Sequence, residues 1–169
     1  MPGHRFFNPN LSSGILSEEE SHHANDVLRL RPGDSAAVFD GKGNEARVRL
    51  TDVSSRAVSY QTLSTTRTPP LPCRVRFGQA LIKPAGMDLL IQKLTELGVT
   101  EIWPIASERS VSKPTGEKRI SNRWDSIALA ACKQSGQNWL PKIHEAAPLD
   151  HSLSSPDPAP PIGRIIGSL

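Results

Sequence analysis

The sequence is poor in cysteine, and this shortage limits the covalent and metal chemistry that it can carry. Its 169 residues contain two cysteines, Cys73 and Cys132, and neither lies near a second cysteine or a histidine at metal-ligand spacing. A disulfide between the two is one interpretation, whereas two buried free thiols in a reducing cytosol is the favoured one. No metal site is therefore predicted.

The sequence also lacks the apolar segments of a membrane span or a secretory signal peptide. No stretch of about 18 apolar residues occurs, so the sequence predicts no membrane span and no membrane partner. The N-terminus, MPGHRFFNPN, lacks the apolar core of a secretory signal peptide. These two absences predict a cytoplasmic protein. The chain has neither a GxGxxG sequence nor a P-loop, so no glycine-rich phosphate cradle is expected.

Positive charge is concentrated in the middle of the chain. Residues 1–70 hold 8 Lys/Arg and 8 Asp/Glu, residues 71–147 hold 11 and 7, and residues 148–169 hold 1 and 2. The middle segment therefore carries the positive field of a chain whose net charge is +3. Such a segment permits a polyanion partner, and it is also compatible with a solvated basic surface.

The first part of the chain has the rhythm of a small β domain. Glu18 to Leu30 is predicted to be a helix, because Ser17 can cap it and three glutamates occupy its first turn. Strands are predicted over 36–40, 44–53 and 56–63, where apolar and polar residues alternate. Short strands with tight turns between them are typical of a small β-barrel.

A proline-rich stretch separates this part from the rest. Residues 65–72, TTRTPPLP, contain three prolines and are predicted to be a linker. We therefore divide the chain into a β domain over 1–68 and an α/β domain over 69–169. Within the second domain, 148–161 is rich in proline and is predicted to be a flexible loop.

The second part follows a strand–helix–strand order with parallel strands. Apolar residues at helical spacing over 87–97 indicate an amphipathic helix, and Gly98 is a suitable residue to end it. The predicted elements are, in order, a strand over 73–82, a loop over 83–86, a helix over 87–97, a strand over 99–105, a helix over 117–135 and a strand over 140–144.

Charged residues follow the first two strands of this α/β unit. Lys83 comes after the first strand, and Glu108 and Arg109 come after the second. Ligands of open α/β sheets bind outside the carboxyl ends of the strands, and lysine and arginine both hold phosphates. The alternative is structural: Arg109 pairs with Glu108 or Glu96 and orders a loop.

At this point the residues resemble a known family. The stretch QALIKPAGMDLLIQKLTELGVTEIWPIASERSV is followed by RW and then by LAACKQSG, while HRFF and VLRLRPGD stand near the N-terminus. Over roughly residues 4–147 these motifs resemble the bacterial 16S ribosomal RNA uridine N3-methyltransferases of the SPOUT class. The resemblance implies a PUA-like β-barrel over 1–68 that helps to hold RNA. It also implies the first part of a SPOUT knot domain over 69–169.

The resemblance implies a reaction and partners as well. It implies S-adenosylmethionine as cofactor, N3 of a uridine as the methylated atom, 16S rRNA or the small ribosomal subunit as substrate, and a homodimer. Gln137 departs from the arginine that usually ends the QSG motif of the family. The GPEGG loop of the cofactor-binding knot is not found, so the cofactor site is expected beyond Leu169 and the chain is expected to be truncated. The alternative function is therefore an RNA-binding fragment without catalysis.

Placement and resemblance together select the candidate site residues. The catalytic candidates are Arg109 and Glu96, and the RNA-binding candidates are Arg5, Arg29, Arg31, Lys83, Lys93 and Arg109. Several have structural alternatives. Glu96 can instead pair with a lysine, Lys93 can be a solvated position, and Arg29 and Arg31 can favour the end of a helix.

Other polar and aromatic residues are given structural roles. His22 and His23 are predicted to be structural, because no carboxylate or cysteine partner is expected within reach along the sequence. Trp103 and Trp124 are predicted to lie in a core or an interface and not to serve as stacking platforms.

Overall fold

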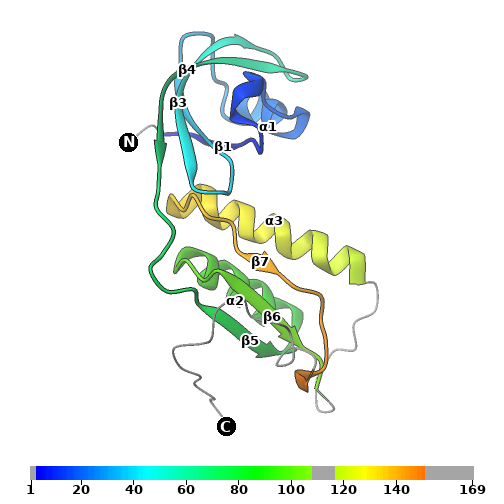
Figure 1. Cartoon of the computed structure of the whole chain (residues 1–169). Helices are drawn as coiled ribbons and strands as arrows, with labels where there is room; N and C mark the ends of the chain where they lie inside the picture. Colours follow the sequence, from blue (N-terminus) through cyan, green and yellow to red (C-terminus); the bar gives the residue numbers. More distant parts are fainter. Residues whose placement is uncertain (1–2, 108–116, 151–169) are drawn as a thin grey trace.

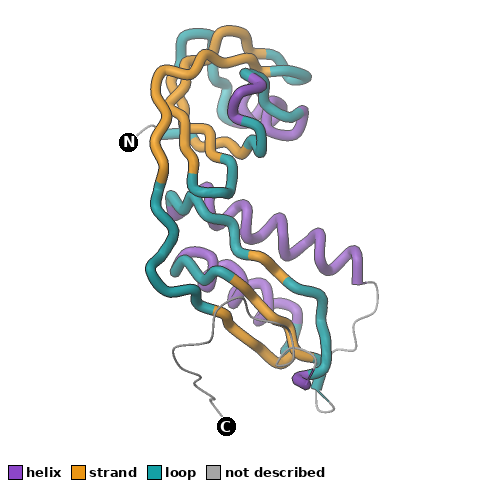
Figure 2. The backbone as a smooth tube through the Cα atoms, viewed as in Figure 1, coloured by secondary structure: helices purple, strands orange, loops and turns teal. Residues whose placement is uncertain are grey.

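The computed structural model describes residues 3–107 and 117–150. Figure 1 shows an N-terminal β-rich part and, beyond it, a smaller sheet with two long helices. The same division is visible in the backbone trace of Figure 2, where a single connection of loop runs from β4 to β5.

The N-terminal part contains a four-stranded sheet. Its strands are β1 (Arg5–Phe7), β2 (Ser35–Phe39), β3 (Asn44–Val53) and β4 (Val58–Arg67), hydrogen-bonded in the order β1-β2-β3-β4. β1 is parallel to β2, and the other two pairs are antiparallel. The bounds predicted for the long strand at 44–53 are confirmed.

Alternation along β3 builds the core of this part. Ala46, Val48 and Leu50 are buried, whereas Arg47 and Arg49 between them are exposed. Side chains of a strand point to opposite faces in turn, so the apolar set packs inward and the arginines face solvent. The half-buried strand predicted from this pattern is therefore confirmed.

One short segment touches both edges of the sheet. After β1 the chain passes through the 3-10 helix η1 (Leu11–Ser13) and returns along β4. The amide of Leu16 donates to the carbonyl of Val58 at 2.9 Å, and the amide of Tyr60 donates to the carbonyl of Gly14 at 2.8 Å. Closure of the sheet into a barrel stays a prediction.

The first helix is shorter than predicted. α1 (Glu18–His22) continues into the π-helical turn η2 (His23–Val27) and does not reach Leu30. Ser17 caps α1 as predicted, accepting from the amide of Glu20 at 3.3 Å. Arg29 ends the helical path because its φ of 55° lies in the left-handed region.

The surroundings of His22 correct another prediction. Its Nδ1 lies 2.5 Å from Oδ2 of Asp26, four positions further along the chain. Residues four apart meet on a helical surface, so a carboxylate partner was within sequence reach. The predicted absence of a partner was therefore wrong, and the interaction is a local structural one.

The linker begins later than predicted. Residues 65–67 were assigned to it, but they extend β4 and pair with Ala46, Glu45 and Asn44 of β3. The prolines that cannot donate to a strand ladder begin only at Pro69, so nothing prevents pairing before that point.

The second part contains a three-stranded parallel sheet with two helices. Its strands are β5 (Arg76–Ala80), β6 (Glu101–Ile105) and β7 (Lys142–Ile143), in the order β5-β6-β7. The helices are α2 (Pro84–Glu96) and α3 (Glu117–Ser135). The predicted parallel strands and the predicted bounds of the second helix are confirmed.

Residues 84–86 do not form the loop that was predicted. They are the first turn of α2, with Pro84 at its start. Proline favours this position because its φ already suits a helix and the first amides of a helix have no partner within it. Lys83 thus stands immediately before the helix.

Both helices pack on one face of the parallel sheet. Ile102 of β6 is fully buried in a core with Ile91 of α2 and with Trp124 and Ala128 of α3. The core position predicted for Trp124 is therefore confirmed. Trp103 lies on the other face of β6, where its ring stacks on His144 with centroids 3.6 Å apart.

The two cysteines are free thiols, as favoured above, but they differ in burial. Cys132 is buried, whereas Cys73 is exposed, so the prediction of burial holds for Cys132 only. Burial raises the pKa of the Cys132 thiol to about 11, against the opposing charge of Arg5. Within the described ranges, no helix is long and apolar enough to cross a membrane.

The turn between β2 and β3 joins the two parts of the chain. The amide of Gly43 donates to the carbonyl of Asn138 at 2.8 Å, and the amide of Leu140 donates to the carbonyl of Gly41 at 3.0 Å. The loop that follows α3 is thereby bound to the N-terminal sheet. This hairpin was predicted, but its partner in the loop was not.

Candidate nucleic-acid interface

The carboxyl ends of β5 and β6 lie side by side, as the sequence predicted. Ala80 pairs with Ile105, the last residues of the two parallel strands. Lys83, which is exposed, follows β5 at this edge. Arg109 and Glu108 lie outside the described residues, and the described chain leads toward them as far as Ser107. Of the two predicted cations, the structure thus places Lys83 at this edge.

Glu96 and Lys93 form a pair at the end of α2. Nζ of Lys93 lies 2.8 Å from Oε2 of Glu96, and the side-chain amide of Gln92 donates to Oε1 at 3.0 Å. The hydrogen bond from Lys93 holds the pKa of Glu96 below its ordinary value. A carboxylate with a lowered pKa is a weaker base, so this environment favours the structural alternative for Glu96 over a catalytic one.

Gln137, at the departure from the family motif, has a structural contact. Its side-chain amide donates to the carbonyl of Glu96 at 3.2 Å. Carbonyls in the last turn of a helix lack partners within the helix, so this bond satisfies one of them. Gln137 thus joins the end of α2 to the loop after α3.

Arg29 and Arg31 lie on the surface of the N-terminal part. Both side chains are exposed, as RNA contacts would require. The turn that contains Arg31 is bound to β3, because the amide of Gly33 donates to the carbonyl of Leu50 at 2.8 Å. Arg49 immediately precedes Leu50 and is also exposed. Sequence reasoning used Arg49 only to recognise a strand and did not count it among the cations of a surface.

Arg5 is held inside the molecule by contacts from both parts of the chain. Its guanidinium donates to the carbonyl of Cys132 at 2.8 Å, to Glu45 at 2.9 Å and to Asn138, and it lies 4.4 Å from the ring centre of Phe39. Its side chain is 12% exposed. These contacts make Arg5 a structural link, so we do not keep it among the proposed RNA contacts.

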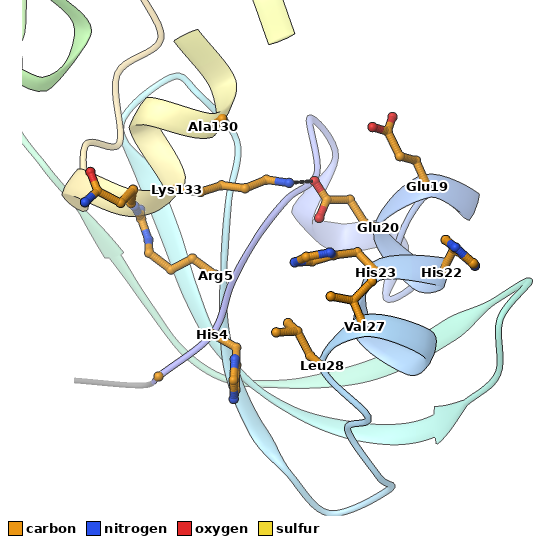
Figure 3. A pocket seen from close by; sticks show the side chains of 12 residues that line it. His4, Arg5, Glu19, Glu20, His22, His23, Val27, Leu28, Ala130 and Lys133 are labelled. Atoms are coloured by element: carbon orange, nitrogen blue, oxygen red, sulfur yellow. Dashed lines mark ion pairs between the residues drawn. The ribbon is translucent and has the colours of Figure 1, made fainter. Parts of the chain in front are cut away.

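A cavity of about 540 Å³ lies between the N-terminal part and the end of α3. Figure 3 shows Arg5 and Lys133 on one side of it and Glu20, His23 and Leu28 on the other. Lys133 forms an ion pair with Glu20, which is only 5% exposed. The two residues are far apart in the sequence, and no sequence pattern indicated that they would meet.

A buried carboxylate binds several side chains on the face of the parallel sheet that lies opposite the two helices. Glu101 is 5% exposed and receives hydrogen bonds from Arg74 at 3.0 Å, from Arg76 at 3.2 Å and from the indole of Trp103 at 3.3 Å. Nε2 of His144 lies 3.0 Å from its second oxygen. The carboxylate thus joins side chains from β5, β6 and the segment after β7, with Arg74 at the exposed side of the group, and these contacts favour a structural role for Glu101.

The pKa values of Glu101 and His144 are both lowered in the folded chain. Burial alone would raise the pKa of Glu101, but the hydrogen bond from His144 and the charge of Arg76 outweigh it and lower that pKa from 4.5. Burial lowers the pKa of His144 from 6.5, against the effect of Glu101. Both groups therefore bind protons less readily in the folded chain than in the unfolded chain.

We expect this pairing to make the fold sensitive to acid. A lowered pKa stabilises the folded state above the unfolded value, and the contribution is lost as pH falls through the folded value. The free energy of unfolding should decline below about pH 6.5 because of His144, and further below about pH 4.5 because of Glu101. Urea unfolding at a series of pH values measures this.

The variant His144→Phe separates the contribution of His144 to acid sensitivity from the titration of the other histidines. Phenylalanine keeps a ring against Trp103 but cannot titrate. Between pH 7 and pH 5.5 the free energy of unfolding should decline less steeply in the variant than in the wild type. Equal slopes would show that His144 does not carry the acid sensitivity.

The described residues show no grouping that would hold a metal. Among them, no three histidine, cysteine, aspartate or glutamate side chains come together as a ligand set. Arg29, Arg31, Arg49 and Lys83 are exposed, as contact with a polyanion would require.

Comparison with known proteins identifies the family. A family model described as "RNA methyltransferase domain" matches residues 69–160, which is more than half of the chain. The chain belongs to this RNA methyltransferase family. A second family model, described as "RNA methyltransferase PUA domain", matches residues 16–59 of this family member.

Curated relatives of this family member carry one shared name. A protein called "Ribosomal RNA small subunit methyltransferase E" from Synechocystis is 38% identical over 135 residues, which cover 79% of this chain and 43% of that protein. The protein of the same name from Bacillus subtilis is 34% identical over 131 residues, covering 76% of this chain and 51% of that protein. The chain therefore spans about half the length of these relatives.

Solved structures of similar proteins contain the cofactor. A ribosomal RNA small subunit methyltransferase E from Neisseria gonorrhoeae, bound to S-adenosyl methionine, is 31% identical with a TM-score of 0.82 and covers 92% of this chain and 66% of that chain. A Legionella pneumophila protein in complex with the same cofactor is 28% identical with a TM-score of 0.75, and covers 86% and 62%. The resemblance to an RNA methyltransferase with a PUA domain is thus confirmed.

Proposed function

We propose that this chain acts in the S-adenosylmethionine-dependent methylation of N3 of a uridine in 16S rRNA. The observation that supports this most strongly is the match of two RNA methyltransferase family models, one for a PUA domain and one for a methyltransferase domain. The names of the curated relatives support the small-subunit rRNA as substrate. The solved relatives with bound cofactor support S-adenosylmethionine as the methyl donor.

The cofactor is not assigned to any described residue. The cavity between the N-terminal part and α3 lies away from the carboxyl ends of β5 and β6, whose arrowheads point away from the N-terminal part in Figure 1. Ligands of parallel α/β sheets bind near those carboxyl ends. The cavity therefore does not fit the place expected for the methyl donor, and we derive no step of the reaction through it.

The described cations would contact the RNA from both the N-terminal part and the parallel sheet. Arg29, Arg31 and Arg49 are each exposed on the N-terminal part, and Lys83 stands at the carboxyl edge of the sheet. Contacts to phosphates fix the position of a nucleic acid without reading its sequence. We propose that these residues orient the RNA while Arg109 lies nearer to the reacting base.

Methyl transfer tests the proposed function directly. Purified protein is incubated with tritiated S-adenosylmethionine and small ribosomal subunits, and the label in uridine is located by nuclease digestion. Incorporation at N3 of uridine supports the proposal. Calorimetric titration with S-adenosylmethionine and light scattering on the same sample test cofactor binding and the proposed homodimer. Binding of RNA without cofactor binding or methyl transfer would favour the alternative, an RNA-binding module.

We expect Arg109→Ala to weaken binding of 16S rRNA tenfold or more, because a bidentate contact is worth about 1–3 kcal/mol and each 1.4 kcal/mol or so is a factor of ten in affinity. Filter binding at fixed salt measures this, since phosphate contacts depend strongly on ionic strength. Arg56→Ala, at an exposed position in the turn before β4, is the matched control and should change the affinity less than twofold. Equal affinities for Arg109→Ala and wild type over a range of salt would remove Arg109 from the site.

A further inference from the structure

The solvent-facing side of β3 carries two exposed arginines, Arg47 and Arg49. They stand two positions apart on the strand, so their side chains leave the same face and their Cα atoms are about 7 Å apart. Within the described parts of the chain, neither side chain forms an ion pair or a hydrogen bond. Two like charges at this spacing repel each other, and an anion bound between them would relieve the repulsion.

Other charged side chains nearby and on the parallel sheet do have partners. Arg74 and Arg76 both contact the carboxylate of Glu101. Glu45, the acidic residue on the same face of β3 as the two exposed arginines, lies 2.9 Å from the guanidinium of Arg5. Its charge is therefore already balanced, and the positive charge of the face is left for an external partner.

Neutral polar side chains surround the two arginines. Residues that pair across strands share a face, and Arg49 pairs with Ser35 of β2 and Gln61 of β4, while Arg47 pairs with Ser64 of β4. Figure 1 shows β3 and β4 running beside each other through the N-terminal part. All five side chains are exposed, and we call them the arginine face. Hydroxyl and amide groups both donate and accept hydrogen bonds, so the face can contact sugar hydroxyls beside phosphates.

The arginine face has no ring on which a base could stack. All three tryptophans, the one tyrosine and the four phenylalanines lie in the described ranges, and none of them is exposed. Unpaired RNA bases are usually held by stacking on aromatic side chains. Double-stranded RNA is recognised instead through its phosphates and through the 2′-hydroxyls along its wide, shallow minor groove. The composition of the face therefore favours a duplex over a single strand.

We propose that the arginine face binds the backbone of a double-stranded segment of the RNA. Arg47 and Arg49 contact phosphates, and Ser35, Gln61 and Ser64 contact 2′-hydroxyls. The inference rests on the proposed function, since the rRNA supplies the duplex. Phosphate contacts carry no sequence information, so this face holds the rRNA in position and leaves the choice of the methylated base to the other part of the chain.

Three labelled nucleic acids of one sequence test the proposal by fluorescence anisotropy: an RNA duplex, one of its strands alone, and the DNA duplex. The RNA duplex should bind about fivefold more tightly than either of the others, the size of one or two hydrogen bonds to 2′-hydroxyls. Equal binding of the three, tighter binding of the single strand, or no binding of the RNA duplex would each overturn the duplex site.

The salt dependence of duplex binding tests the two arginines. Each neutralised phosphate contributes about 0.9 to the slope of log affinity against log salt, so Arg47→Gln/Arg49→Gln should reduce that slope by about 2. Arg47→Lys/Arg49→Lys keeps both charges and should keep the slope. Arg56→Gln/Lys142→Gln removes the same net charge from exposed positions outside the arginine face and is the matched control. An unchanged slope in the first variant, or an equal reduction in the control, would remove the arginine face as the site.

The methyl-transfer assay keeps this inference separable from the proposed function. Methylation of small subunits by a protein without a preference for duplex RNA would leave the proposed function standing and overturn the duplex site. Duplex binding that depends on Arg47 and Arg49, in a protein without methyl transfer, would support the arginine face and count against the proposed function.

Discussion

Replacing Glu101 with alanine is expected to lower the free energy of unfolding by about 2–3 kcal/mol, the scale for removing a buried charged acceptor from its hydrogen bonds. Its carboxylate is 5% exposed and meets Arg74, Arg76, Trp103 and His144. After the substitution the donors on this face of β6 lose their common acceptor. Arg74 is 56% exposed and can turn to water, whereas His144 is 16% exposed, and a donor left without an acceptor away from water costs more than the original bond contributed.

Urea unfolding followed by tryptophan fluorescence measures the change, because Trp103 is itself part of the group. Glu145→Ala is the matched control: Glu145 is exposed in the segment that follows β7, and its replacement should change stability by about 0.5 kcal/mol or less. Glu101→Gln keeps the shape but turns an N–H₂ toward donors, so its loss should fall between the two. A loss below about 1 kcal/mol for Glu101→Ala would contradict a structural role of this carboxylate.

Local patterns were enough to predict the elements in which one physical signal dominates. β3 was predicted with its observed bounds because apolar and charged residues alternate along it, and α3 because its apolar face repeats at helical spacing. The parallel order of β5 and β6 followed from the helix between them. In each case the information lies within one element and its neighbours along the chain.

Errors arose where a second signal competed. Pro84 was interpreted as part of a loop, although proline also begins helices, and α2 starts there. Thr65 to Arg67 were assigned to the linker because of prolines further along, yet they pair with β3. The helix predicted to reach Leu30 ends early because Arg29 takes a left-handed conformation, which is uncommon outside glycine.

The contacts that place the two parts of the chain against each other had no sequence signal. Arg5 reaches the carbonyl of Cys132, 127 positions away. Glu20 meets Lys133 in the same region. Such pairs are defined only when the hairpin turn and the loop after α3 are in place. The cavity between them could therefore not be predicted from one sequence. The position of Lys83 could be predicted, because it depends only on where the preceding strand ends.

Replacing Gly43 with alanine should have the other large effect on stability, a loss of about 3 kcal/mol or more. Gly43 has a φ of 95°, a conformation that costs about 1–3 kcal/mol for a residue with a side chain. An added Cβ would also lie 2.5 Å from Cζ2 of Trp139 and 2.9 Å from the carbonyl oxygen of Thr68. The indole cannot simply withdraw, because its N–H donates to that same carbonyl at 3.1 Å.

Gly33→Ala separates the two causes. Gly33 has a φ of 97°, close to that of Gly43, but an added Cβ would meet no atom within 4 Å. Its substitution should therefore report the backbone strain alone, about 1 kcal/mol. The excess loss in Gly43→Ala is then the steric overlap with the loop after α3. Thermal or urea unfolding of the two variants beside the wild type gives this difference, and equal losses would rule out the overlap.

A double-mutant cycle with Trp139→Ala shows whether the overlap acts through the indole. If it does, Gly43→Ala should be less damaging in the Trp139→Ala background, with a coupling of about 1 kcal/mol or more. The contact with Thr68 would remain, so the recovery should be incomplete. Because Gly43 also donates to Asn138, the same overlap pushes the loop away from the turn that binds it. The coupling thus measures how firmly the N-terminal sheet and the end of α3 are held together, which is the geometry on which the cavity between them depends.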